Sequence, residues 1–289
     1  MKKTVLVLGS TGMIGHQVFR YLDLSQDYDL FNYSFRKKLN EDSIMIDATD
    51  EKTFFGKIEE LEPNFIINCI GILIEQCNQD ILRAIQLNAL LPHKLENLAE
   101  KMDCQLIHMS TDCVFSGRKQ EPYIETDEKD GLDIYAKTKG LGEVLNDNHL
   151  TLRTSVIGPE LKKDGDELFN WFMAQTGEIQ GYSKALWSGV SSLELAKVVK
   201  WAIDNNIKGL YHVTNGKTIS KYELLSLMKK HTQSKINIKP TDDYKVDKSF
   251  VDSRQEINFK IPSYDEMVLN MIQFIQLNSK LYPHYELRQ

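Results

Sequence analysis

Short apolar runs alternate with longer amphipathic segments along most of the chain. Nearly every position in the runs is apolar, as in strands that a parallel sheet buries on both faces. The segments between the runs have apolar residues at helical spacing. This alternation predicts an α/β protein with a doubly wound, Rossmann-like parallel sheet. The expected strands are residues 4–8, Asp29–Ser34, Ile44–Asp47, Phe65–Gly71, Gln105–Met109, Leu150–Thr154 and Gly209–Val213.

Capping residues and a proline indicate where several helices begin. Ser220 and Glu223 have the spacing of a capping box, and the same spacing recurs from Ser263. Pro92 predicts a kink, or a helix that begins near it. The expected helices are residues 13–22, Glu51–Leu61, Asp80–Met102, Tyr135 to about Asn146, Glu167–Gln175, Ser191–Asn205, Ser220–His231 and Ser263–Leu277.

The character of the chain changes after residue 155. Residues 116–133 and Gly181 to Gly189 are expected to form loops, and Ile236–Pro240 is expected to form a short edge strand. We expect a Rossmann domain mainly over residues 1–155 and a smaller α/β lid mainly over residues 156–289. Some segments of the second part should return to the core of the first.

Composition narrows the range of functions. Of the 289 residues, 42% are hydrophobic and 26% are charged, as in an ordinary globular protein. The net charge of -6 argues against nucleic acid as the main partner, because binding to a phosphate backbone needs a concentrated basic surface. No stretch reaches the ~20 apolar residues of a membrane span, and Gly9 interrupts the first apolar run too early for a signal peptide. We therefore expect a cytoplasmic protein without a membrane partner.

The cysteines predict structural thiols and no metal site. Cys69, Cys77, Cys104 and Cys113 form no C-x-x-C pair and have no histidine at zinc spacing. Cys69 and Cys104 lie beside apolar runs, where a free cysteine behaves as a small hydrophobe. His108 lies inside such a run and is expected to be a core histidine.

A glycine-rich turn follows the first expected strand directly. Gly9, Gly12 and Gly15 have the spacing G-x-x-G-x-x-G, and a helical pattern begins within it. Glycines let the backbone approach a pyrophosphate, whose charge the helix N-terminus meets. The spacing differs from the standard G-x-G-x-x-G, and a turn without a ligand stays open as an alternative. The cofactor contacts expected here are Gly9, Ser10, Thr11, Gly12, Met13, Ile14 and Gly15.

The second expected strand indicates which dinucleotide binds. In NAD-binding proteins this strand commonly ends on an acidic residue that holds the ribose 2′-hydroxyl. Here Arg36 and Lys37 follow the strand, which suits a 2′-phosphate and favours NADP(H) over NAD(H). A solvated run of charges is the alternative. Further cofactor contacts are expected where later strands end, at Asp47, Ala48, Cys69 and Gly71.

Tyr135 and Lys139 are the candidate catalytic pair. They share one face of an expected helix, where a lysine can lower the pKa of a phenol by favouring the phenolate. A phenol titrates near ~10, so work at neutral pH needs a shift of about three units and a second positive charge. Thr111 lies at the carboxyl end of an expected strand, where ligands of open α/β sheets bind. For Asn88, within an expected helix, spacing alone favours no role.

In this order and context the motifs resemble the extended short-chain dehydrogenase/reductase family. The segments 110–117 (Ser-Thr-Asp-Cys-Val-Phe-Ser-Gly) and 135–143 (Tyr-Ala-Lys-Thr-Lys-Gly-Leu-Gly-Glu) look most like nucleotide-sugar 4-ketoreductases of the dTDP-4-dehydrorhamnose reductase type. Gly209–Val213 is similar to a segment of their C-terminal part. The resemblance covers nearly the whole chain.

The resemblance implies NAD(P)(H) and reduction of a 4-keto-6-deoxy sugar on a nucleoside diphosphate, for surface polysaccharide synthesis. It implies that Tyr135 donates a proton, that Lys139 lowers the phenol pKa and holds the nicotinamide ribose, and that Thr111 orients the carbonyl. A homodimer is compatible with it. The expected substrate contacts are Ser110, Thr111, Asp112, Phe169, Asn170, Trp187 and Arg254.

Two alternatives stay open. An epimerase or dehydratase of the same superfamily is disfavoured, because such dehydratases usually carry Thr-Asp-Glu where Asp112 is followed by Cys113. A non-catalytic NADP-binding regulatory subunit is disfavoured by the intact Thr111, Tyr135 and Lys139, since it needs no such acid. Cys113 stands where the nearest relatives usually have tyrosine, which leaves the sugar and the nucleotide open.

Overall fold

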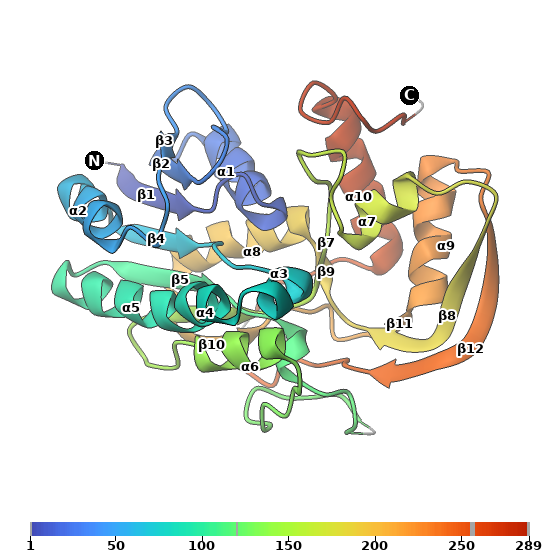
Figure 1. Ribbon diagram of the computed structural model, residues 1–289. Coiled ribbons are helices and arrows are strands. Elements are labelled where there is room, and N and C mark those ends of the chain that lie inside the picture. Colours follow the sequence, from blue (N-terminus) through green and yellow to red (C-terminus); the bar gives the residue numbers. More distant parts are fainter. Residues whose placement is uncertain (1, 120, 255–257, 288–289) are drawn as a thin grey trace.

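A seven-stranded parallel sheet forms the centre of the protein. The computed structural model describes residues 2–119, 121–254 and 258–287. The strands of the sheet are β1 (Lys3–Leu8), β2 (Tyr28–Ser34), β3 (Ile44–Met45), β4 (Phe65–Asn68), β5 (Gln105–Met109), β6 (Leu150–Arg153) and β10 (Gly209–His212). They lie in the order β10-β6-β5-β4-β1-β2-β3, and every neighbouring pair is parallel (Figure 1). This confirms the predicted doubly wound α/β fold.

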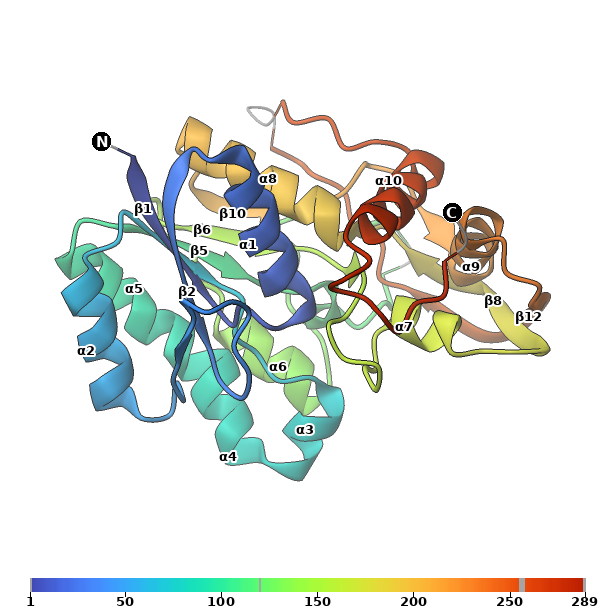
Figure 2. The ribbon, with the colours of Figure 1, turned by 90° about the horizontal axis from the view of Figure 1, so that it is seen from above.

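Helices cover both faces of this sheet, as Figure 2 shows. Helices α1 (Met13–Ser25) and α8 (Ser192–Asn205) pack side by side on one face. On the other side lie α2 (Glu51–Leu61), α3 (Ile74–Gln79), α4 (Ile81–Ala84), the π-helical turn η1 (Ile85–Leu90), α5 (Leu91–Lys101) and α6 (Ile134–Leu141). A single 3₁₀ turn, η2 (Asp112–Val114), follows β5.

Strand β1 shows why the strand sequences are apolar at successive positions. Val5 and Val7 point into a buried cluster that includes residues of α1 and α8. Leu6 and Leu8 point into a second cluster, which includes residues of α2 and α5. Alternate side chains of a strand leave opposite faces of the sheet, so a sheet covered on both faces buries them all.

The C-terminal part packs beside the sheet and contributes to it. It contains β7 (Val156–Ile157), α7 (Leu168–Met173), β8 (Glu178–Trp187), β9 (Val190–Ser191), β11 (Ile219–Ser220), α9 (Lys221–Thr232), β12 (Asn237–Asp247) and α10 (Tyr264–Leu277). Strands β11, β8 and β12 form a second sheet, in which β8 and β12 run parallel. Helix α8 and strand β10 return to the main sheet. No helix within the described ranges is long and apolar enough to cross a membrane.

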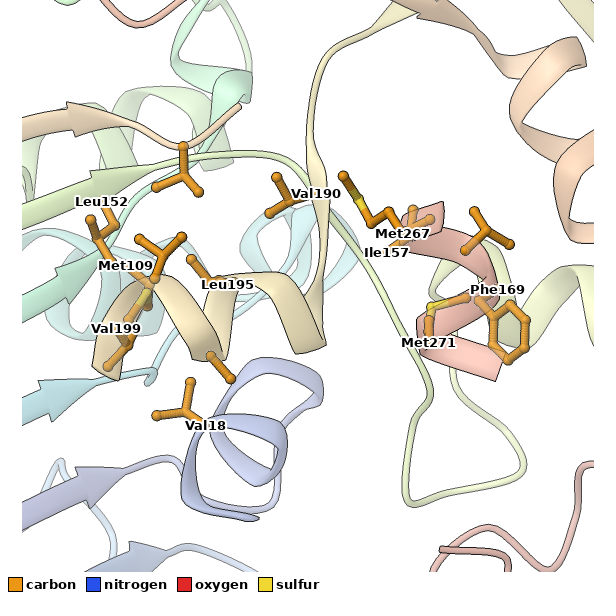
Figure 3. Packing of buried hydrophobic residues seen from close by; sticks show 14 of the residues in the cluster. Val18, Met109, Leu152, Ile157, Phe169, Val190, Leu195, Val199, Met267 and Met271 are labelled. Atoms are coloured by element: carbon orange, nitrogen blue, oxygen red, sulfur yellow. The ribbon is translucent and has the colours of Figure 1, made fainter. Parts of the chain in front are cut away.

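One hydrophobic core joins the two parts. Figure 3 shows Met109 and Leu152 of the main sheet close to Leu195 and Val199 of α8. The same cluster continues through the short strands β7 and β9 to α10 and α7; there it includes Ile157, Phe169, Val190, Met267 and Met271. The C-terminal part is therefore packed onto the sheet by shared apolar burial.

Several predicted boundaries are wrong; β4, for example, ends at Asn68 and not at Gly71. The predicted loop from Gly181 to Gly189 lies largely within strand β8. Gly181 is buried at a position where a Cβ would come within 2.8 Å of Tyr222. This glycine interrupts the alternation of apolar and polar residues by which a strand is recognised in the sequence. The helix after Tyr135 ends at Leu141 rather than near Asn146. There the backbone at Gly142 approaches the helix η1 so closely that a Cβ would lie 2.0 Å from the Asn88 carbonyl oxygen. Strand β12 continues well beyond the predicted Ile236–Pro240, with an irregularity after Thr241.

A buried ionic network ties three strands together behind the carboxyl edge of the sheet. The guanidinium of Arg153 donates to both carboxylate oxygens of Glu143, at 2.8 and 2.7 Å, and also to His212 Nε2 at 2.8 Å. Ser110 donates to the same carboxylate at 2.6 Å. The Arg153 and Glu143 side chains are 1% and 0% exposed, so each charge depends on the other.

Replacing Arg153 should destabilise the protein strongly. Arg153→Met leaves the buried Glu143 carboxylate without its main partner, and the expected loss is about 3–5 kcal/mol of unfolding free energy. Urea denaturation followed by circular dichroism measures it. Lys57→Met, which removes an exposed ion pair with Glu60, is the matched control and should change little. A small loss in Arg153→Met would contradict the structural role given to this pair.

Candidate active site

A cavity of about 450 Å³ opens at the carboxyl ends of the parallel strands. Its lining comes from the turn after β1, the ends of β2 and β3, the segment after β4, the end of β5, helix α6 and residues 160–167. The predicted site residues that line it are Gly9, Thr11, Gly12, Met13, Ile14, Arg36, Asp47, Ala48, Cys69, Gly71, Ser110, Tyr135 and Lys139. A second cavity, of about 500 Å³ between α1 and the end of α10, contains none of the predicted site residues.

The glycine-rich turn needs two of its glycines for its own packing. Gly9 has φ +73°, in the region that favours glycine, and its amide donates to the Tyr33 carbonyl oxygen at 3.0 Å. A Cβ on Gly15 would lie 2.2 Å from the Gly9 carbonyl oxygen. Gly12 is different, because a Cβ there would meet only that oxygen, at 3.4 Å. Gly12 also caps α1 without any side-chain hydrogen bond, so the helix N-terminus faces the cavity unblocked.

The far end of the cavity is formed where β2 and β3 end. Ser34 is buried there, lines the cavity, and its hydroxyl has no hydrogen-bond partner among the described residues. Arg36 also lines the cavity, whereas Lys37 does not. Arg83 of α4 reaches the same end and forms an ion pair of 3.5 Å with Asp47. No motif in the sequence indicated Arg83.

Tyr135 and Lys139 both line the cavity from the first turns of α6. The Asp133 side chain caps this helix and accepts from the Ala136 amide at 2.7 Å, which fixes where the helix begins. Lys139 is buried, and its ammonium donates to the Met109 carbonyl oxygen at 2.6 Å. Burial lowers the pKa of Lys139 to about 8, although the Glu143 carboxylate acts in the opposite direction.

The pKa of Tyr135 does not follow the expectation from the sequence. Burial raises it above the ordinary value, electrostatic interactions with Cys113, Asp112 and Glu167 act in the same direction, and a hydrogen bond with Thr111 lowers it. Lys139 is not among the main causes of this shift. In the protein without a cofactor, the net shift of this pKa is therefore opposite to the lowering that catalysis by Tyr135 was expected to need. Burial makes desolvation the largest cause of the shift, and the Lys139 ammonium donates to the Met109 carbonyl oxygen.

The segment after β5 places Thr111 beside the phenol. The Thr111 hydroxyl accepts from the Cys113 amide at 3.1 Å and so caps the turn η2. Ser110 donates its proton to Glu143, which commits that hydroxyl to the buried network. The carboxyl of Asp112 is buried, and its pKa is raised by that burial. Burial likewise raises the pKa of the Cys113 thiol to about 12, so this cysteine is not a thiolate at neutral pH.

Four predicted substrate residues lie away from the cavity lining. Phe169 and Trp187 are buried in the hydrophobic core. The Asn170 amide donates to the carbonyl oxygens of Lys163 and Gly165. Arg254 donates to the carbonyl oxygens of Lys208 and Leu210. Thr111 and Asp112 adjoin the lining residue Ser110 without being part of the lining themselves.

Sequence reasoning missed several residues that hold or line the site. Asn88 accepts from the Ile72 amide at 2.9 Å and donates to the Ile72 carbonyl oxygen at 3.0 Å, and so fixes the segment that carries Gly71. Glu160, Lys162 and Glu167 line the cavity from the connection before α7. Burial, with the Glu160 charge, raises the pKa of Glu167 to about 7. No motif marks these residues, because their connection reaches the cavity only through tertiary packing.

Candidate metal ligands do not gather at one place in the described part of the chain. Within the described ranges, no group of three or more histidine, cysteine, aspartate or glutamate side chains is arranged to hold a metal ion. Cys69, Cys77, Cys104 and Cys113 are free thiols. His108 is fully buried and its Nδ1 lies 3.1 Å from the Asn68 amide nitrogen, consistent with the predicted core role.

Similarity to known proteins points to a family. Residues 1–249 match the protein family described as RmlD substrate binding domain. The chain is 26% identical over 224 residues to the spore coat polysaccharide biosynthesis protein SpsK of Bacillus subtilis, with 76% of each chain covered. It is 26% identical to the dTDP-4-dehydrorhamnose reductase of Aggregatibacter actinomycetemcomitans, again with 76% of each covered. It is also 26% identical to methionine adenosyltransferase 2 subunit beta of Xenopus tropicalis, covering 78% of this chain and 71% of that one.

Solved structures share the fold. A dTDP-4-dehydrorhamnose reductase from Bacillus anthracis, in complex with NADP, superposes with a TM-score of 0.81 at 23% identity, covering 96% of this chain and 100% of that one. The Bordetella bronchiseptica enzyme WbmH, in complex with NAD+, has a TM-score of 0.75 at 16% identity, with 95% and 98% covered. Both similarities concern the Rossmann-like architecture.

Two glycine substitutions should separate packing from ligand binding. Gly15→Ala pushes a Cβ against the Gly9 carbonyl oxygen, so we expect a loss of about 1–3 kcal/mol of stability together with weaker nucleotide binding. Gly12→Ala meets only an ordinary contact within the protein, so we expect an unchanged melting temperature and weaker NADPH binding. Thermal unfolding and fluorescence titration measure the two effects. If Gly12→Ala binds NADPH as well as the wild type, the predicted contact between Gly12 and a dinucleotide is wrong.

Proposed function

We propose a function for this chain, which belongs to the RmlD substrate binding domain family within the extended short-chain dehydrogenases/reductases. The proposed function is that of an NADPH-dependent reductase that acts on a nucleoside-diphosphate 4-keto-6-deoxy sugar. The observation that carries the proposal is that one cavity is lined by the glycine-rich turn, Tyr135 and Lys139. The dTDP-4-dehydrorhamnose reductase among the relatives supports the choice of substrate class. The name of the Bacillus subtilis relative supports a role in polysaccharide synthesis.

The cavity fits a dinucleotide. Gly12 carries no side chain at the N-terminus of α1, where the backbone amides of Thr11, Met13 and Ile14 would be available to a pyrophosphate. The unpartnered Ser34 hydroxyl and the Arg36 guanidinium would hold the adenosine end. Arg36, and the absence of an acidic side chain from the end of β2, support NADP(H) over NAD(H). The NADP complex of the Bacillus anthracis protein agrees with this preference, and the NAD+ complex of WbmH shows that the fold accepts either.

Each catalytic side chain has a defined part in the proposed reduction. When bound, the nicotinamide supplies the hydride that the sugar's carbonyl carbon accepts. Tyr135 donates its phenolic proton to the carbonyl oxygen, which becomes the hydroxyl of the product. Thr111, within hydrogen-bonding reach of the phenol, orients the carbonyl oxygen towards it. A positioned acid of this kind contributes ~10²–10⁴-fold to the rate.

The pKa values suit work in the reductive direction. A phenol with a raised pKa is fully protonated at neutral pH, which is the form that the reduction consumes. With a pKa of about 8, Lys139 is mainly an ammonium at the same pH. Its charge stabilises the phenolate that remains once the proton has left. Lys139 thus makes the release of the proton less costly, while burial keeps the net pKa of the resting phenol raised.

A second candidate function is that of a dinucleotide-binding regulatory subunit. The similarity to methionine adenosyltransferase 2 subunit beta favours it. Such a subunit has no need of a protonated phenol beside a buried ammonium in its nucleotide cavity. Tight NADPH binding without turnover of any 4-keto sugar would favour this function over the reductase.

Removing the phenolic hydroxyl tests the proposal. NADPH absorbance is followed with a panel of dTDP- and UDP-linked 4-keto-6-deoxy sugars, and we expect the wild type to reduce at least one of them. Tyr135→Phe should lower the turnover by at least about 10²-fold and leave the NADPH dissociation constant nearly unchanged. Tyr222→Phe, whose ring lies at the second sheet rather than in the cavity, is the matched control. Retained turnover in Tyr135→Phe would contradict the role of Tyr135 as the proton donor.

The pH profile should report Lys139. Because burial lowers its pKa to about 8, the ammonium is lost as the pH rises through that value, and kcat/KM should fall over the same range. The titratable groups that interact with the ammonium are Glu143, Cys69, Cys77 and the buried His108, and the two thiols are themselves buried with raised pKa values. Lys139→Arg keeps a charge at every pH and should remove the limb near pH 8. A profile that stays flat to pH 10 in the wild type would contradict this role.

A further inference from the structure

Arg83 approaches the adenosine end of the cavity from an element that lies far from Arg36 in the sequence. It lies on α4, which begins at the Asp80 cap. Its guanidinium carbon is 5.4 Å from the centre of the Phe35 ring, and that of Arg36 is 5.3 Å from the centre of the same ring. Phe35 is 46% exposed, so the ring is a platform at the cavity mouth rather than part of the core.

The charges at this platform do not balance. Arg83 pairs with Asp47, whose pKa is lowered because hydrogen bonds from Thr49 and the charge of Arg83 outweigh the effect of burial. Asp47 is therefore ionised and offsets one of the two guanidinium charges. The other remains, and two like charges held against one ring repel each other. An anion bound between them would relieve that repulsion.

Beside the platform, the Asp47 carboxylate pairs with Arg83, and Ser34 supplies a further donor. Ser34 precedes Phe35 and offers a buried hydroxyl that has no partner among the described residues. A phosphate monoester carries about −1.5 to −2 charges at pH 7 and three strong acceptor oxygens. A ribose 2′-hydroxyl carries no charge and gains little from two guanidinium groups. The site therefore matches a phosphate monoester better than a free hydroxyl.

We propose that Arg83 and Arg36, which both approach the Phe35 ring, clamp the 2′-phosphate of NADP(H), and that Arg83 is therefore a specificity-determining residue. Asp47 and the Phe35 ring hold the Arg83 guanidinium in place, so its donors are pre-oriented before the phosphate arrives. The proposal rests on the dinucleotide site of the proposed function. It adds a contact from α4 that the run of basic residues after β2 does not predict.

Binding of cofactors and of their adenosine fragments tests the clamp. Dissociation constants for NADPH, NADH, 2′,5′-ADP and 5′-AMP are measured by isothermal titration calorimetry. Arg83→Gln should weaken NADPH and 2′,5′-ADP about 10- to 100-fold and change NADH and 5′-AMP by no more than about twofold. Arg83→Lys keeps the charge without the planar fork and should give an intermediate loss. Arg20→Gln removes a guanidinium that pairs with Asp23 outside this cavity, and is the matched control.

The outcomes are distinct. Equal weakening of the phosphorylated and unphosphorylated ligands would show that Arg83 supports the adenine or the local fold, and would overturn the clamp. So would unchanged 2′,5′-ADP binding in Arg83→Gln. Arg83 is about one-third exposed, and an unchanged melting temperature confirms that the variant is folded. The binding test uses no sugar substrate, so it is independent of the reductase assay. The clamp can be confirmed even if no 4-keto sugar is reduced, and it can be contradicted even if one is reduced.

Discussion

The parallel pairing of seven strands is the constraint on which the site depends. Because neighbouring strands point the same way, their carboxyl ends meet at one edge of the sheet. In the register of the sheet, Leu8 pairs with Tyr33 on one side and Asn68 on the other, and Asn68 pairs with His108. The glycine-rich turn, the basic segment after β2 and Ser110 to Thr111 all follow directly from these positions. Segments separated by a hundred residues thus line a single cavity.

Burial on both faces of the sheet sets the electrostatics at this edge. Lys139 is buried at the cavity wall, where desolvation lowers its pKa although the Glu143 carboxylate raises it. The ammonium therefore loses its proton more easily than it would in water. The same desolvation keeps Tyr135 protonated. Glu143 also accepts from Ser110 and Arg153, so one buried carboxylate links the strand ends to the catalytic helix. Removing water strengthens every charge interaction in such a site.

Close backbone contacts hold the elements of the site at fixed distances. Gly15 lies against the turn at Gly9, and Gly142 lies against the helix at Asn88; neither place has room for a side chain. The second contact also ends α6 soon after Lys139. Asn88 uses both its amide groups on Ile72, which fixes the loop that follows β4. The polar lining is therefore carried on segments with little freedom to shift.

The sequence by itself determined the fold class and the core of the candidate site. Apolar runs alternating with amphipathic segments require a sheet buried on both faces, and the glycine turn, Thr111, Tyr135 and Lys139 follow strand ends or helix starts that local pattern reveals. Local pattern could not reveal strand β8, because Gly181, which lies against Tyr222, interrupts the alternation of apolar and polar residues. It also could not reveal Arg83, Glu160 or Glu167, which reach the cavity only through packing between distant elements. Tertiary packing also decides in which direction the pKa of Tyr135 shifts. Desolvation depends on how much of the chain surrounds a group and not on its neighbours in sequence.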